Sequence, residues 1–207
     1  MRVAMNITTA DEDLSRFAGP DDLRGYLDEH HLDGIEVMPL GDSLCWLPPE
    51  RVLGMHLSYY PCWVDFWRGD EAGLIAEFGS LDAAAAHYGG ADRRVLVDKF
   101  ASQLVMAERI GARYAVFHVA DVSTAESVRY RFGHTDEQVV ASALELIDAF
   151  AGDWRGRCRL LVENLWWPGL TMARPEVTRA LMDGIRTPGK GIMLDTGHLM
   201  HTNPALT

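Results

Sequence analysis

The chain has 207 residues, 48% of them hydrophobic and 24% charged, so it can form one sizeable core and does not fall in the class of wholly disordered proteins. Its 30 acidic residues outnumber 19 basic ones, and the net charge of −11 disfavours nucleic acids and other polyanions as partners. Three cysteines without C-x-x-C spacing argue against a disulfide framework and fit a reducing compartment.

The first residues, MRVAMNITTADEDLS, show no basic region leading into a long apolar run, so we expect no secretory signal. No stretch of about 18 apolar residues occurs, so we also expect no membrane-spanning helix. A cytoplasmic location is the resulting expectation.

Six short apolar runs are predicted strands because Gly, Pro or charged residues border each of them. Their hydrophobicity is continuous rather than alternating, which is typical of strands buried on both faces of a parallel sheet. The runs are residues 3–7, 34–40, 52–59, 114–121, 159–167 and 191–197.

Helical periodicity fills most of the connections between these runs. Residues 21–34 carry apolar side chains on one face, and this helix is expected to close at Gly34, before the next strand. Residues 95–112 repeat apolar side chains at i, i+3 and i+4, with Gly111 as the candidate C-cap.

Two further helices carry recognisable starts. Thr135 and Gln138 form a capping box for a helix that runs to about Phe150. Pro175 suits the first turn of a helix that continues through Met182.

Two connections depart from this pattern. The connection at 40–51 is short and poorly helical. The segment 60–92 is too long for an ordinary βα loop, and we interpret it as an excursion over the rim that shapes or covers a pocket.

Strands that alternate with helices predict an α/β fold, either doubly wound or closed into a barrel. The first strand lacks a G-x-G-x-x-G turn, which disfavours a dinucleotide-binding sheet. Ionisable side chains instead recur at the carboxyl ends of several strands, where TIM-type (β/α)₈ barrels carry their sites. We therefore predict a single TIM-barrel domain over residues 1–207, with about six βα units present.

The ionisable residues at these strand ends are Glu36, His56, His118, Glu163, Asp195 and His198. Carboxylates and neutral imidazoles without thiolates suit Mn²⁺, Mg²⁺, Co²⁺ or Zn²⁺, so we predict one bound divalent ion. Buried carboxylates after apolar strands are costly unless they are paired or bind metal. Glu36 is interpreted as mainly structural, and an inert ring of hydrogen-bonded polar residues is the alternative for the whole set.

Aromatic residues cluster beside two of these strand ends. Aromatic walls around a few polar groups are typical of sites that hold small sugars or polyols. Packing of the rim excursion against the barrel is the alternative explanation, and it carries equal weight for Trp63, Trp67 and Trp166. The aromatic residues are Tyr59, Tyr60, Trp63, Phe66 and Trp67 after the third strand, and Trp166 and Trp167 after the fifth.

In chain order, the series His56, His118, Glu163 and Asp195-x-x-His198 resembles the xylose isomerase-like (β/α)₈ barrel superfamily. The segments ENLWWPGL and LDTGH resemble its fifth- and sixth-strand motifs. That group includes sugar isomerases and epimerases, inosose dehydratase-type enzymes and endonuclease IV-type nucleases of abasic sites.

The resemblance implies that Glu163, Asp195 and His198 are metal ligands, and that Glu163 and His198 also act in catalysis. His56 and His118 match histidines that bind zinc in the nucleases, and we expect them to contact substrate here. The nucleases carry His-Pro-Gly at the fourth strand, whereas Val119 and an alanine follow His118 in this chain, which disfavours that branch.

The implied function is a metal-dependent isomerase or epimerase that acts on a sugar, ketose or polyol through an enediolate-type intermediate. An abasic-site endonuclease and a non-catalytic sugar-binding barrel are the alternatives. The expected partner is a small carbohydrate, without nucleic acid or membrane.

A closed eight-stranded barrel takes about 250 residues, whereas six strands are predicted here. The last two βα units would supply, by the resemblance, a further metal ligand and a second acid/base glutamate. We expect either a longer natural chain or closure of the gap by a second copy, which would make a homo-oligomer.

Overall fold

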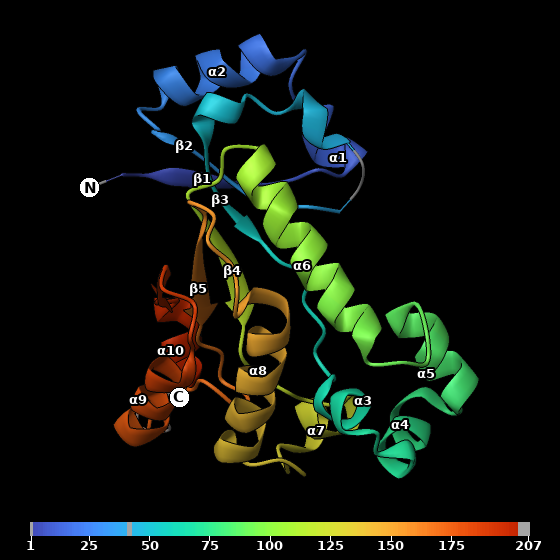
Figure 1. The fold of residues 1–207 in the computed structure, drawn as a ribbon. Coiled ribbons are helices and arrows are strands. Elements are labelled where there is room, and N and C mark those ends of the chain that lie inside the picture. Colours follow the sequence, from blue (N-terminus) through green and yellow to red (C-terminus); the bar gives the residue numbers. More distant parts are fainter. Residues whose placement is uncertain (1, 41–42, 203–207) are drawn as a thin grey trace.

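Six parallel strands form one sheet in the order β1-β2-β3-β4-β5-β6, so each strand pairs with its neighbours in the sequence (Figure 1). The computed structural model describes residues 2–40 and 43–202. A doubly wound sheet would reverse its strand order, whereas this consecutive order is that of a barrel wall. The predicted α/β fold is confirmed as part of a TIM-type barrel. The strands are β1 (Ala4–Thr8), β2 (Gly34–Met38), β3 (Val52–His56), β4 (Tyr114–His118), β5 (Arg159–Glu163) and β6 (Lys190–Met193).

Helices follow most of the strands, as the sequence predicts. The connection between β2 and β3 contains only two 3₁₀ turns, η1 (Ser43–Trp46) and η2 (Pro49–Arg51), beside residues 41–42, which lie outside the described part. In the described chain, no helix is both long enough and apolar enough to cross a membrane. The helices are α1 (Asp11–Leu14), α2 (Pro20–Glu29), α3 (Val64–Arg68), α4 (Glu71–Phe78), α5 (Leu81–Tyr88), α6 (Arg94–Arg109), α7 (Thr124–Arg129), α8 (Asp136–Ala151), α9 (Pro175–Gly184) and α10 (Thr196–Thr202).

Helix ends follow the local signals with one exception. Both halves of the Thr135–Gln138 capping box are present at the start of α8, and Gly111 has a left-handed φ of 87° just after α6. The expected close of the first long helix at Gly34 is wrong, because α2 ends at Glu29 and Gly34 begins β2. Glycine is needed there because an added Cβ would collide with the backbone carbonyl of Arg51.

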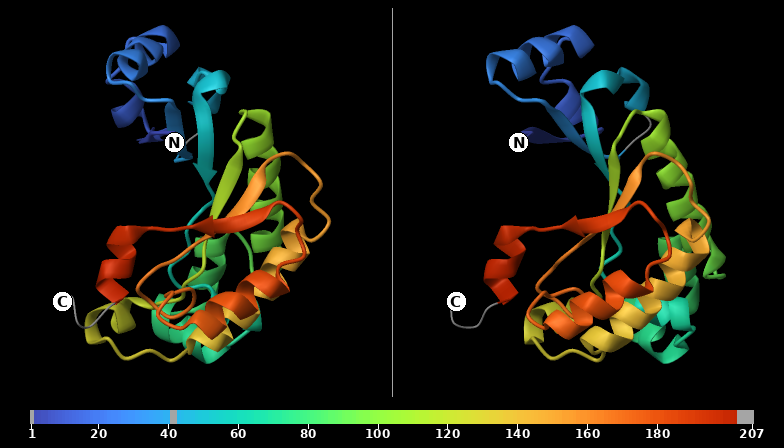
Figure 2. Two further views of the ribbon diagram at one scale, coloured as in Figure 1. Left: turned by 90° about the vertical axis from the view of Figure 1, so that its left-hand side faces the viewer. Right: turned by 60° about the vertical axis from the view of Figure 1, so that its left-hand side comes forward.

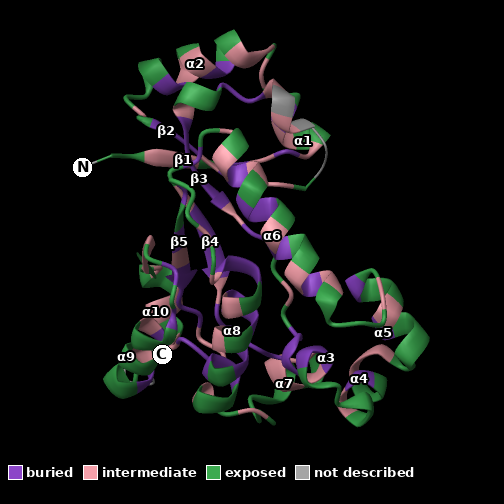
Figure 3. Cartoon of the chain, in the orientation of Figure 1, coloured by how far each residue is buried: buried purple, intermediate pink, exposed green. Residues whose placement is uncertain are grey.

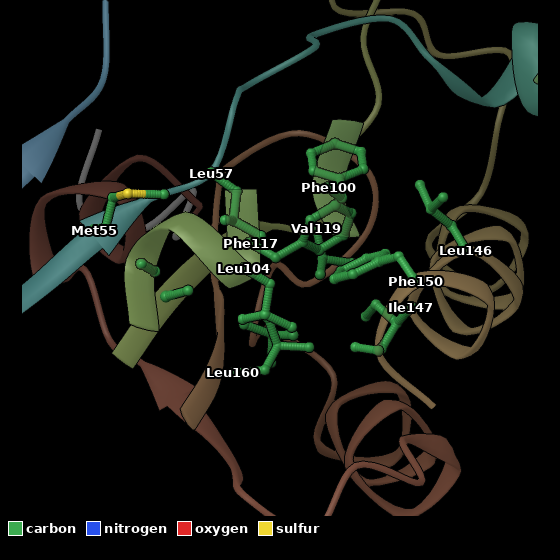
Figure 4. Packing of buried hydrophobic residues seen from close by; sticks show 14 of the residues in the cluster. Met55, Leu57, Phe100, Leu104, Phe117, Val119, Leu146, Ile147, Phe150 and Leu160 are labelled. Carbon is green, nitrogen blue, oxygen red and sulfur yellow. The ribbon is translucent and has the colours of Figure 1, made fainter. Parts of the chain in front are cut away.

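Helices α6, α8 and α9 cover the outer face of the sheet and form the main core with it (Figures 1 and 4). Phe117 of β4 lies between Phe100 of α6 and Phe150 of α8, with ring centroids 5.2 and 5.8 Å away. Leu104 and Leu160 are also fully buried in this cluster. Burial of these apolar side chains stabilises the wall, at about 25 cal/mol per Å² of apolar surface.

The opposite, inner face of the sheet carries the polar side chains. Strands β3, β4 and β5 are buried along most of their length (Figure 3), yet His56, His118 and Glu163 end them on this face. Helix α10 lies on this side of the strands, away from α6 and α8 (Figure 2). Successive side chains of a strand point to opposite faces, so the same strands serve the core and the site.

The segment 60–92 folds into the three short helices α3, α4 and α5. It packs through buried residues of its own, among them Phe66 and Tyr88, whose rings stack with centroids 3.9 Å apart. These buried residues belong to the same hydrophobic core as the sheet, α6 and α8, and α3 contacts α8 directly.

A candidate active site at the carboxyl ends of the strands

A pocket of about 630 Å³ opens over the inner face, where the strands end. Its size is ordinary for a site that binds a small molecule. Apolar side chains form part of its wall, and the polar groups converge from all six strands or the loops that follow them. The polar residues that line it are Asn6, Glu36, His56, Ser58, Tyr59, His118, Glu163, Asp195 and His198.

Glu163 is the central group of this pocket, and its two carboxylate oxygens face different partners. Its side chain is 5% exposed. Oε2 lies 3.1 Å from Nε2 of His118 and 3.8 Å from Nδ1 of His56. Oε1 lies 3.7 Å from Nδ1 of His198. The carboxylate thus lies between His56 and His118 on one side and His198, which follows β6, on the other.

Glu36 extends the polar network on the β2 side. Its Oε1 lies 3.0 Å from Nε2 of His56, and both side chains are about 15% exposed. Tyr114 projects from β4 nearby; burial, with a smaller effect of the Glu36 charge, raises the pKa of its hydroxyl to about 12. Glu36 therefore lies within the site, whereas its interpretation from the sequence alone is mainly structural.

Asp195 and His198 are held in place by Asn164, the residue that follows Glu163. The Asn164 amide accepts a hydrogen bond from the Asp195 N–H at 2.9 Å and donates one to its carbonyl at 3.0 Å. The Asp195 carboxylate accepts from the His198 N–H at 2.7 Å, at the start of α10. His198 Nδ1 lies 2.8 Å from the Asn164 carbonyl, and because a carbonyl only accepts, Nδ1 donates this hydrogen bond.

The chemistry of these donors fits a divalent ion. Two groups bring their ligand atoms within 4.8 Å of one another: His56, His118 and Glu163, and Glu163, Asp195 and His198. Within the described residues, Glu163 Oε2 and His118 Nδ1 are buried without a hydrogen-bond partner, because the 3.1 Å contact of Oε2 with His118 Nε2 lacks the angles of a hydrogen bond. A buried carboxylate oxygen that lacks a donor is costly, and a cation or a proton beside it would remove that cost.

The turn that carries Trp166 and Trp167 is fixed against β4. Leu170 N–H donates to the Val119 carbonyl at 2.8 Å, and Ala120 pairs with Gly169 across an antiparallel bridge. Gly169 has a φ of 135°, and an added Cβ would collide with the Val119 carbonyl. This close approach leaves little freedom to the residues that follow Glu163.

The predicted tryptophans lie in different surroundings. Trp63 donates from its indole to the Ala120 carbonyl at 2.8 Å, and Trp67 donates to Glu145 at 2.9 Å. Both are buried in the hydrophobic core, and neither lines the pocket. Trp166 lies edge-on to His198 with ring centroids 4.9 Å apart, behind the pocket rather than in its lining.

Tyrosines, not tryptophans, supply the aromatic wall. The ring of Tyr59 is 5.0 Å from that of His118, and Tyr60 is the one residue of the segment 60–92 in the lining. Burial raises the pKa of the Tyr59 hydroxyl well above its usual range, so it stays protonated. Their place directly after the third strand was the available signal in the sequence.

The sequence reasoning missed Asn164 and a second polar cluster. The signal for Asn164 was its position next to Glu163 at a strand end. In the second cluster, the His134 ring lies 3.0 Å from Asp121 and 3.2 Å from Asp65 of α3. Hydrogen bonds to these two carboxylates raise the pKa of His134 to about 10.

Comparison with known proteins agrees with this geometry. A family model described as the xylose isomerase-like TIM barrel matches residues 70–206. The crystal structure of a D-tagatose 3-epimerase-like protein superimposes with a TM-score of 0.54 and 14% identity, over 97% of this chain and 67% of that one. At this identity the likeness shows the fold alone. Among curated proteins, no sequence matches.

Proposed function

This chain belongs to the xylose isomerase-like TIM barrel family, and on that premise we propose that it is a divalent-metal-dependent isomerase or epimerase of a sugar, ketose or polyol. The observation that carries the proposal is Glu163. It is a buried carboxylate with one oxygen near His56 and His118 and the other oxygen near His198. Such a group can hold an ion and move a proton in the same site.

Glu163, Asp195 and His198 would hold the ion, because one ligand atom of each lies within 4.8 Å of the others. When bound, a divalent ion supplies a Lewis acid that stabilises negative charge on adjacent oxygens of a hydroxy-ketone. Asp195 would act as a ligand, and His198 would serve as a ligand or as a contact to a substrate hydroxyl.

Glu163 takes the proton from the carbon beside the carbonyl and returns it to the former carbonyl carbon, while the proton of the neighbouring hydroxyl passes to the former carbonyl oxygen; this is the acid/base step of an isomerisation through an enediolate-type intermediate. His56 and His118 bind the substrate beside Oε2 of Glu163. Tyr59 and Tyr60 cover apolar faces of the substrate and exclude water.

The first experiment measures metal content and turnover together. Purified protein is dialysed against Mn²⁺, its metal content is determined, and it is assayed with ketoses and polyols for C–H exchange in D₂O. About one tightly bound ion per chain, lost in Asp195→Ala, and exchange at carbon are the expected results. No bound ion and no exchange would instead indicate a binding barrel, and several zinc ions with cleavage of abasic duplex DNA would indicate a nuclease.

The Glu163→Gln variant tests the acid/base role. Gln is nearly isosteric but cannot carry the proton, so we expect turnover to fall about 10²- to 10⁴-fold. Glu29→Gln, an exposed change on α2, is the control and should leave turnover unchanged. Full turnover in Glu163→Gln would contradict the assignment.

A further inference from the structure

Gln103 is a buried amide that reaches a residue of the pocket from the outer layer of helices. It lies on α6, which covers the outer face of the sheet, and it is 5% exposed. Its Oε1 accepts a hydrogen bond from the backbone N–H of Ser58 at 2.9 Å, and its Nε2 donates one to Oγ of the same serine at 2.7 Å. Ser58 comes after β3 and lines the pocket, whereas Gln103 does not.

These two contacts fix the direction of both hydrogen bonds. A backbone N–H can only donate, so the oxygen of the Gln103 amide faces it. The NH₂ group at the other end of the amide also can only donate, so Oγ of Ser58 is the acceptor. No titratable group takes part in either bond, so the direction does not change with pH.

The hydroxyl hydrogen of Ser58 is left for a partner other than Gln103. Oγ carries one hydrogen, and no residue in the described part of the chain accepts it. A hydroxyl donor without an acceptor, on a residue that lines a pocket open to ligands, is suited to bind an oxygen of a ligand.

The strand order places Ser58 away from the proposed ion. Strands β4 and β5 separate β3 from β6, and the proposed ligands Glu163, Asp195 and His198 belong to the β5 and β6 side. The pocket of about 630 Å³ is large enough for a carbon chain that extends from the ion to Ser58. Ser58 is therefore placed to bind a part of the substrate that the ion does not hold.

We propose that Ser58 is a specificity-determining residue, whose hydroxyl donates a hydrogen bond to a substrate oxygen remote from the ion, and that Gln103 is the positioning residue that keeps this hydroxyl a donor. The inference rests on the proposed function and narrows its substrate class to ketoses whose carbon chain continues beyond the oxygens held by the ion. A three-carbon hydroxy-ketone lacks the oxygen that Ser58 binds.

The direction of the Ser58 hydroxyl is tested first, by neutron diffraction from crystals of the deuterated wild-type protein without substrate. We expect the deuterium atoms on Nε2 of Gln103 to face Ser58 Oγ, and the hydroxyl deuterium to point away from Gln103 into the pocket. A hydroxyl deuterium directed at Gln103 or at a backbone carbonyl would overturn the inference. This result does not depend on which reaction the protein catalyses.

The substrate contact is tested by the KM and kcat of C–H exchange with D-tagatose and with dihydroxyacetone, a three-carbon hydroxy-ketone. We expect Ser58→Ala to raise the KM for D-tagatose about 5- to 10-fold, the effect of one hydrogen bond, with a smaller effect on kcat. The KM for dihydroxyacetone should change less than about 2-fold, because this molecule does not reach Ser58. Ser102→Ala, an exposed change on α6, is the matched control.

Equal effects of Ser58→Ala on the two ketoses, or no effect on D-tagatose, would overturn the contact. Exchange with neither ketose in the wild type would count against the proposed function itself, whereas the neutron result decides the direction of the hydroxyl independently.

A double-mutant cycle tests whether Gln103 acts through Ser58. Gln103→Leu removes both ends of the amide, so it should raise the KM for D-tagatose in the wild type but cause no further rise in Ser58→Ala. Additive effects of the two changes would overturn the positioning role and leave Gln103 a structural residue. Thermal unfolding of each variant is measured in parallel, and Gln103→Met takes the place of the leucine variant if that variant does not fold.

Discussion

Asn164 shows how one side chain fixes the geometry of the site. It is fully buried, and both ends of its amide bond the backbone of Asp195, which follows the neighbouring strand β6. Its own carbonyl accepts from the His198 ring. The positions of Asp195 and His198 thus depend on Asn164. This residue does not line the pocket, and it is not among the proposed ligands of the ion. Such supporting contacts determine how well ligands are oriented.

We expect Asn164→Ala to weaken Mn²⁺ binding about 10- to 100-fold, because Asp195 and His198 lose the contacts that hold them. Isothermal titration of the folded protein with Mn²⁺ measures the effect. Thr187→Ala is a matched control, since it removes another buried hydrogen bond, to the Ala151 carbonyl, away from the pocket. Equal Mn²⁺ affinity in the two variants would contradict the role of Asn164.

Among the helices of the segment 60–92, α3 is attached to the barrel by ionic contacts as well as by packing. Protonated His134 lies between Asp65 of α3 and Asp121 of the loop after β4. Asp121 also accepts from the backbone N–H groups of Trp63 and Val64 at 2.7 and 2.9 Å. The cluster therefore joins α3 to the loops that follow β4.

This attachment should depend on pH. The pKa of His134 is raised from 6.5 to about 10 in the folded state, so its stabilising contribution is fully present below about pH 6.5. The contribution declines as the pH rises and is lost above about pH 10. We expect the difference in Tm between the wild type and His134→Gln to shrink over this range. A difference that stays constant from pH 6 to 10.5 would contradict the raised pKa.

Helix α6 illustrates the packing of a whole element. Leu104 is fully buried against the sheet, whereas its neighbour Val105 is 49% exposed. Leu104→Ala should lower the free energy of unfolding by about 2–5 kcal/mol through lost transfer energy and a cavity. Val105→Ala, on the same helix, should change it by less than about 0.5 kcal/mol. Urea unfolding measures both, and similar losses would contradict the burial of Leu104 in the core between α6 and the sheet.

The six-stranded sheet is open and has two edge strands, β1 and β6. In the described part of the chain, β1 and β6 each pair with a single neighbouring strand, so their outer sides are unpaired. Apolar side chains lie near these edges, with Val3, Ile192 and Leu194 exposed by 45%, 36% and 49%. Unpaired strand edges with exposed apolar side chains favour association between chains.

We therefore expect the chain of these 207 residues to self-associate at micromolar concentrations, and Ile192→Lys to weaken the association, since lysine on an edge strand opposes pairing. Sedimentation velocity over a concentration series measures this. Val128→Lys is the control, because Val128 is 79% exposed on α7, away from both edges. A wild-type chain that is monomeric throughout, or equal effects of the two variants, would contradict the edge as the contact.

The sequence predicted most of the fold because its signals are local. Continuous apolar runs determined all six strands, and the capping box and Pro175 determined the starts of α8 and α9. Parallel strands bring their carboxyl ends to one side. Knowing where each strand ended was therefore enough to predict that His56, His118, Glu163, Asp195 and His198 would lie together.

Contacts between elements were decided only by the tertiary structure. Whether Glu36 bonds His56 depends on the register of β2 against β3, which shifts within the pair. Whether Trp63 and Trp67 face a pocket or a core depends on how three short helices pack. The bond between Asn164 and Asp195, 31 residues apart in the sequence, requires that the ends of β5 and β6 lie side by side. Periodicity and turn signals are properties of neighbouring residues, whereas the partner of a polar side chain is set by the relative placement of whole elements.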